Sequence, residues 1–144
     1  MTAARRNAGF LLVGYSIFLA WALFWPSSSH QSGAVLRLQE ALAHLPLPTR
    51  VEVLMSYERL EVVMNAVIIA PVTFLASVVF PGLSWRDWTA GAFVASATVE
   101  AFQGLALPGR HAAFSDVVAN TVGALAGALL VALARSMLRA RKSR

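Results

Sequence analysis

The 144-residue sequence contains no cysteine and few charged residues, and both shortages limit what the protein can be. Without cysteine, a disulfide scaffold and a thiolate metal site are excluded. Charged residues make up only 13% of the chain, against about a quarter in a soluble domain. Hydrophobic residues make up 58%, which excludes a disordered chain. The composition is that of an integral membrane protein.

Four stretches are apolar and long enough to cross a bilayer, which requires roughly 20 residues of helix. They cover residues 8–25, 62–80, 89–107 and 117–134. The first stretch is too long for the hydrophobic part of a cleaved signal peptide, and no small-residue cleavage pattern follows it. We therefore expect an all-α, polytopic membrane protein whose single domain, residues 1–144, is a bundle of four transmembrane helices.

The segment between the first two stretches, residues 26–61, carries apolar residues at helical spacing. We expect it to contain a short external amphipathic helix that lies on the outer surface. The apolar positions that define this helix are Val35, Leu38, Leu42 and Leu45.

The basic residues predict the orientation of the chain. With the N-terminus inside, eight of the twelve bases face the cytoplasm, five of them in the tail 135–144. This distribution obeys the positive-inside rule and places both termini in the cytoplasm. The tail has no aromatic partners and no domain of its own, so we expect it to contact anionic headgroups rather than nucleic acid.

Six polar side chains come from three of the predicted helices and occupy the outer third of the membrane, while the inner halves of these helices are almost entirely apolar. Glu100 lies about 10 Å below the outer end of its helix, and Gln103 lies one turn shallower on the same face. A charge within a span is costly and usually marks a functional or paired position. The set comprises Glu61, Asn65, Glu100, Gln103, Asp116 and Asn120.

We predict that these polar faces meet in one cavity that opens to the exterior. Arg110, in the loop before the last stretch, would pair with Glu100 or Asp116, because an unpaired charge there would be costly. If a reaction occurs, Glu100 is the predicted general acid or base, and Asp116 would orient a partner or a water. The predicted substrate-binding residues are Arg110, Gln103, Asn120 and Asn65.

There are two alternatives to a catalytic or binding site. The same polar residues could serve only to lock the helices together. A channel is disfavoured, because the polar level does not continue to the cytoplasmic side. The three histidines lack metal-ligand spacing, and nucleotide and hydrolase motifs are absent, so we expect no metal and no cofactor.

Two features concern helix packing. Gly123 and Gly127 form a GxxxG pattern, which is typical of a close contact between helices. Pro71 falls midway along the second stretch, where it removes a helical hydrogen bond.

The order and spacing of these residues resemble the VanZ-like family of membrane proteins over residues 61–130. The matching residues are Asn65 six positions before Pro71, Ser96 four before Glu100-x-x-Gln103, then Arg110, Asp116 and Asn120-Thr-x-Gly123. The chain departs from the family at Thr73, where glycine is frequent. It also has Ala113 and Ser115 where many members have acids, which argues against a divalent-metal site in that loop.

The resemblance implies a cell-envelope protein, and the named members imply low-level resistance to glycopeptide antibiotics of the teicoplanin type. It implies a phenotype more readily than a reaction. Two functions remain: binding or modification of an envelope lipid, such as a phospholipid or a lipid-linked cell-wall precursor, at the outer leaflet, or a non-catalytic accessory or assembly role in the membrane.

Overall fold

The computed structural model describes residues 2–24, 33, 36–38, 40–41, 57–106 and 113–143. These residues include four long helices and no strand, which confirms the all-α prediction. The helices are α1 (Ala3–Phe24), α4 (Tyr57–Val79), α5 (Trp85–Ala106) and α6 (Phe114–Lys142).

Each predicted span matches one of these helices, and the first three spans end one residue beyond it. The helices begin three to five residues earlier than predicted, and α6 ends later. An apolar stretch marks only the part of a helix that avoids water, so polar turns at its ends are missed. Of the external helix predicted over 35–45, only residues 36–38 and 40–41 are described, and they are helical.

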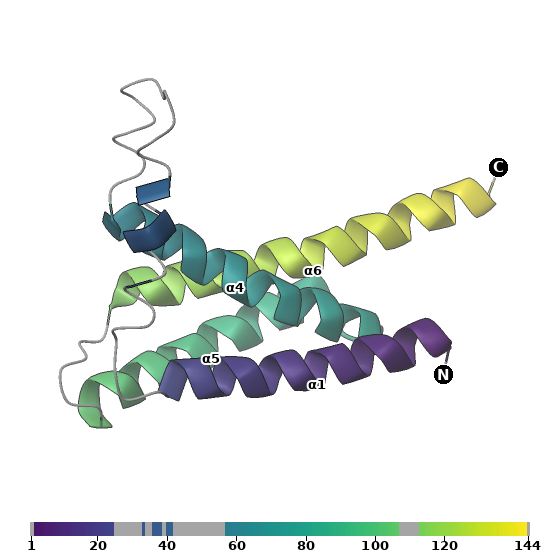
Figure 1. Cartoon of the computed structure of the whole chain (residues 1–144). Coiled ribbons are helices and arrows are strands. Elements are labelled where there is room, and N and C mark those ends of the chain that lie inside the picture. The colour runs from purple at the N-terminus through teal and green to yellow at the C-terminus, as the bar shows by residue number, and fades with distance from the viewer. Residues whose placement is uncertain are drawn as a thin grey trace, which may run out of the picture.

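Helix α6 is the centre of the bundle, with α4 and α5 packed against it and α1 packed on α4 (Figure 1). Helices α4 and α6 run in the same direction, whereas α1 and α5 run in the opposite direction. The two termini and the turn between α4 and α5 therefore lie at one end of the bundle. We call this the terminal end, and the end at which α5 finishes and α6 begins the far end.

The packing is inverted relative to a soluble protein. Most of the buried apolar side chains are alanines, and no large side chain is fully buried among the described residues. Large apolar side chains instead face outward on all four helices, such as Phe10 at 72% exposure and Leu105 at 90%. Two helices, α4 over Arg59–Val79 and α6, are long and apolar enough to cross a membrane. Small residues at helix contacts and large ones outside are the pattern of membrane helices.

Helices α4 and α6 meet backbone to backbone at the GxxxG pattern. A Cβ atom placed on Gly123 would collide with the carbonyl of Ala66, and one on Gly127 with the carbonyl of Ala70. The predicted close-packing face is therefore confirmed. The Thr73 hydroxyl adds a hydrogen bond across the same contact, donating to the carbonyl oxygen of Ala124 at 2.9 Å.

Side chains from neighbouring helices satisfy backbone carbonyls of α4. The Tyr15 hydroxyl donates to the Ile68 carbonyl at 2.8 Å, next to the carbonyl that Pro71 deprives of its helical donor. At the C-terminus of α4, Arg5 Nε donates to the carbonyl of Val79 at 2.6 Å. Because the last carbonyls of a helix lack intrahelical donors and carry partial negative charge, an arginine there stabilises the helix end.

The start of α5 is fixed by a reciprocal cap. The Ser84 backbone N–H and hydroxyl both donate to Asp87 Oδ2 at 2.8 Å, and the Asp87 N–H donates to Ser84 Oγ at 3.4 Å. These hydrogen bonds, and above all the one from the Ser84 backbone N–H, hold the pKa of Asp87 below its ordinary value. Together with Pro81 and Gly82 they turn the chain sharply between α4 and α5.

The backbone contact makes a direct prediction about Gly123. We expect Gly123→Ala to destabilise the protein by about 1–3 kcal/mol, because its methyl group would push α4 away. Gly91→Ala is the matched control, since a Cβ at this position of α5 meets no atom within 4 Å. Unfolding of the purified chain in mixed detergent measures both variants. Equal stability of the two would contradict the contact.

Candidate functional site

Three polar side chains of α5 form a buried face. Ser96, Glu100 and Gln103 are only 7%, 9% and 4% exposed, and their spacing of four and three residues puts them on one side of the helix. On the same helix, Phe102 is 50% exposed. Helix α5 therefore turns its polar side inward and its aromatic side outward.

Glu100 contacts the beginning of α6. Its Oε2 atom accepts a hydrogen bond from the backbone N–H of Ala113 at 3.0 Å. Ala113 is the residue that precedes α6, and no side chain of its own segment caps that helix. A carboxylate from α5 thus accepts the backbone N–H of the N-cap residue, as the glutamate of a capping box does, at a helix end where the dipole favours negative charge. Asp116, in the first turn of α6, adds a second carboxylate at this helix end.

Asn120 forms a second link between α5 and α6. Its Nδ2 atom donates to Ser96 Oγ at 2.9 Å. Asn120 follows Asp116 by four residues, so the two lie on one face of α6. The helices are antiparallel, so Glu100, which lies one turn after Ser96 on α5, contacts α6 nearer its beginning than Ser96 does.

Helix α4 brings Asn65 to a neighbouring level. Its next residue, Ala66, contacts Gly123, which lies one turn beyond Asn120 on α6. Asn65 itself is half-buried. The same register of α4 on α6 places Asp116 level with Arg59.

The predicted site residues are therefore placed in part. Glu100, Gln103, Asp116 and Asn120 belong to the two helices that meet at the far end, with Asn65 on the third. Arg110, the predicted cationic partner, lies outside the described residues, as does His111. Within the part of the chain that the structure describes, no group of three or more His, Asp or Glu residues could hold a metal ion.

Two polar contacts were missed at the sequence level. Ser96 was only a motif position there, whereas the structure makes it the acceptor for Asn120. Thr73, a departure from the family pattern, is 4% exposed and bridges α4 to α6. The signal for it was the run of small residues on one face of α4, at spacings of four, three and four: Ala66, Ala70, Thr73 and Ser77.

These features define a class of protein: a helical bundle with small-residue helix contacts, apolar outer surfaces and a buried polar face near one end. The sequence model of the VanZ/LLP1 family matches residues 11–135, and the chain belongs to this family. Neither a curated protein nor a solved structure gives a significant match.

The link between Ser96 and Asn120 predicts an energetic coupling. We expect a cycle of Ser96→Ala, Asn120→Ala and the double variant to give a coupling free energy of about 0.5–2 kcal/mol. Thr98→Ala replaces Ser96→Ala in a control cycle, since the exposed Thr98 hydroxyl donates only within its own helix, to Val94. Unfolding in mixed detergent measures each variant. No coupling at Ser96, or as much at Thr98, would show that the bond is not formed.

Proposed function

We propose that the protein binds or modifies an envelope lipid or a lipid-linked cell-wall precursor at the outer leaflet. The observation that carries this proposal is the polar face of α5, namely Ser96, Glu100 and Gln103, buried against the start of α6. Ionisable groups within membrane helices are expensive and are retained mainly at functional or paired positions. Here they gather at the far end, away from both termini.

The proposal includes four membrane spans, with α1 and α5 crossing beside α4 and α6. Exposed apolar side chains on α1, such as Phe10 and Ile17, and on α5, such as Val94, support their contact with lipid. Seven of the twelve bases lie at the terminal end among the described residues, and the positive-inside rule assigns that end to the cytoplasm. The far end then meets the outer leaflet.

In the proposed site, Glu100 acts as the general acid or base if a reaction takes place, and Asp116 orients a water or a partner group. Gln103, Asn120 and Asn65 supply amide donors and acceptors for a headgroup. Arg110 gives charge-assisted hydrogen bonds to a phosphate. Resistance to glycopeptides such as teicoplanin is the phenotype that the family resemblance suggests for such a site.

A specific observation favours a second candidate, a non-catalytic accessory or assembly role. The Glu100 carboxylate already accepts the Ala113 N–H, and the Asn120 amide already donates to Ser96. Both groups therefore join α5 to α6, which is what helix-locking residues do. The two candidates differ in whether the acidic function of Glu100 is needed or only its oxygen.

Glu100→Gln separates the two candidates, because glutamine keeps an oxygen for the Ala113 N–H but removes the charge and the titrating proton. We expect this variant to lose the teicoplanin resistance that the wild-type chain gives a susceptible bacterium, at unchanged abundance in the membrane. If Glu100 is the general acid or base of a reaction at this site, the rate of that reaction falls about 100-fold or more. The measurements are the minimum inhibitory concentration and the amount of tagged chain in isolated membranes.

Glu40→Gln is the matched control, since Glu40 is an exposed acid outside the four helices. It should behave as the wild type. Full resistance in Glu100→Gln would support the accessory role and contradict an ionisable site. Loss of the protein itself from the membrane would assign Glu100 to folding.

A further inference from the structure

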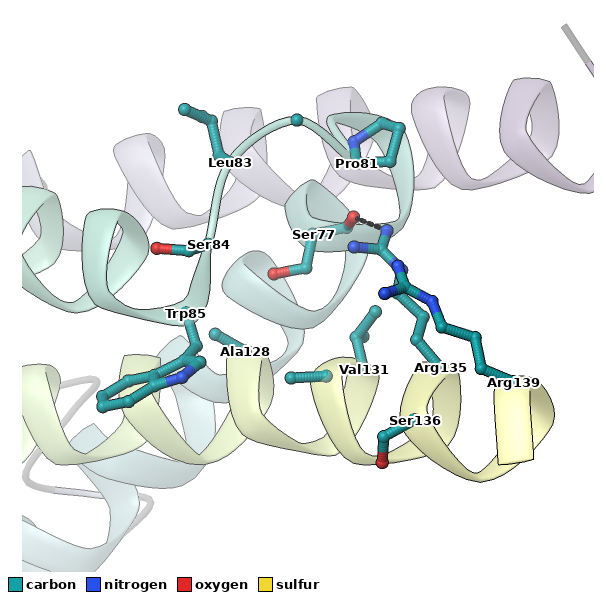
Figure 2. A pocket seen from close by; sticks show the side chains of 12 residues that line it. Ser77, Pro81, Leu83, Ser84, Trp85, Ala128, Val131, Arg135, Ser136 and Arg139 are labelled. Carbon is teal, nitrogen blue, oxygen red and sulfur yellow. Dashed lines mark hydrogen bonds between the residues drawn. The ribbon is translucent and has the colours of Figure 1, made fainter. Parts of the chain in front are cut away.

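A cavity of about 460 Å³ lies at the terminal end, which is the opposite end of the bundle from the proposed site. It is bounded by the end of α4, the turn into α5 and the C-terminal half of α6 (Figure 2). Its volume falls within the range of roughly 300–1,000 Å³ that is usual for small-molecule sites. The residues that matter for its chemistry are Arg135, Arg139, Ser77, Trp85 and Ser136.

Two arginines give the cavity its charge. Arg135 and Arg139 are four residues apart on α6, so they share a face, and Figure 2 shows both side chains rising from α6 toward the end of α4. No acidic side chain among the described residues lines the cavity. Arg86, whose guanidinium lies 4.7 Å from the ring centre of Trp85, adds a further positive charge beside its wall.

Arg135 is held in place before any ligand arrives. One of its terminal nitrogens donates to the Ser77 carbonyl at 2.5 Å, which fixes the guanidinium at the C-terminus of α4. A guanidinium has five N–H donors in a fixed fork, so the others remain for a bound group. Such preorganised forks suit phosphate oxygens, which accept two parallel hydrogen bonds.

Ser77 supplies an independent indication of a ligand. Its side chain is 3% exposed, it lines the cavity, and its hydroxyl has no hydrogen-bond partner among the described residues. A buried hydroxyl without a partner costs about 1–3 kcal/mol, and native proteins rarely leave one so. In Figure 2 this hydroxyl points away from the two guanidinium groups, so the Ser77 side chain would have to rotate about its Cα–Cβ bond before the hydroxyl could donate to an anion bound beside them.

We propose that this cavity binds the phosphate group of an anionic phospholipid headgroup. The position favours a lipid over a soluble phosphate, because the cavity lies where two membrane-compatible helices, α4 and α6, approach the terminal end. Trp85 in its wall is a typical residue of the membrane interface. The apolar side chains of Leu83 and Val131 also line it and would contact the glycerol and the first acyl carbons. This site is separate from the outer-leaflet site and does not depend on it.

The test is retention of phosphatidylglycerol by the purified full-length chain, measured by native mass spectrometry against an equal amount of phosphatidylcholine. Arg139→Gln should weaken retention about tenfold or more, because it removes charge-assisted hydrogen bonds. Arg141→Gln is the matched control. It removes the same charge from the same helix, but Arg141 is exposed and does not line the cavity.

Ser77→Ala gives the second arm, because two explanations of its hydroxyl predict different outcomes. If the hydroxyl binds phosphate, the variant folds normally and retains about two- to tenfold less phosphatidylglycerol. If the hydroxyl is only an unsatisfied group, the variant becomes more stable and retention is unchanged, which would overturn the proposal.

The source of the phosphate is tested with soluble probes. Millimolar glycerol 3-phosphate and inorganic phosphate should displace little phosphatidylglycerol from the wild-type chain. Full displacement by either probe would overturn the lipid assignment in favour of a soluble ligand. An equal loss of retention in Arg141→Gln and Arg139→Gln would show unspecific attraction to the basic tail and would overturn the site.

Discussion

The close approach of α4 to α6 at Gly123 and Gly127 fixes how the other helices and their polar side chains are placed. Because no side chain separates the two backbones there, the helices have only one register available to them. That register brings Thr73 to the carbonyl of Ala124 and Arg135 to the carbonyl of Ser77. It also determines which polar residues of α4 lie beside those of α6 at each end.

Helix α6 carries opposite chemistry at its two ends. Its first turn contains Asp116 and receives the Glu100 carboxylate, whereas its last turns carry arginines. Negative groups at the beginning and positive groups at the end of a helix both complement its dipole. The same arrangement gives the protein an acidic polar face at the far end and a basic cavity at the terminal end, with small-residue contacts between them.

The sequence was sufficient for the four helices and for the glycine contact, because long apolar stretches and GxxxG patterns depend on local spacing. The three-residue spacing of Glu100 and Gln103 likewise showed that they share one face of α5. Their partners could not be predicted, since Ala113 offers only a backbone N–H, which leaves no mark in the sequence. Arg5 was interpreted only as a topology signal, and Arg135 only as part of a basic tail that also contacts headgroups, but each satisfies a carbonyl of α4. That role depends on helix register, and so does the cavity beside Ser77.

The polar face of α5 is turned toward α6, and the absence of cysteine allows a direct measurement of this orientation. Cysteines replace Ser96 and Asn120 in one variant, and Thr98 and Asn120 in a second. A short thiol cross-linker is applied to native membranes, and the linked peptides are quantified by mass spectrometry. The structure predicts efficient linkage for the first pair, because Asn120 Nδ2 and Ser96 Oγ are 2.9 Å apart in the native chain. It predicts little linkage for the second pair, because Thr98 is exposed. Preferential linkage through position 98 would mean that α5 turns Glu100 toward lipid, and would contradict the account.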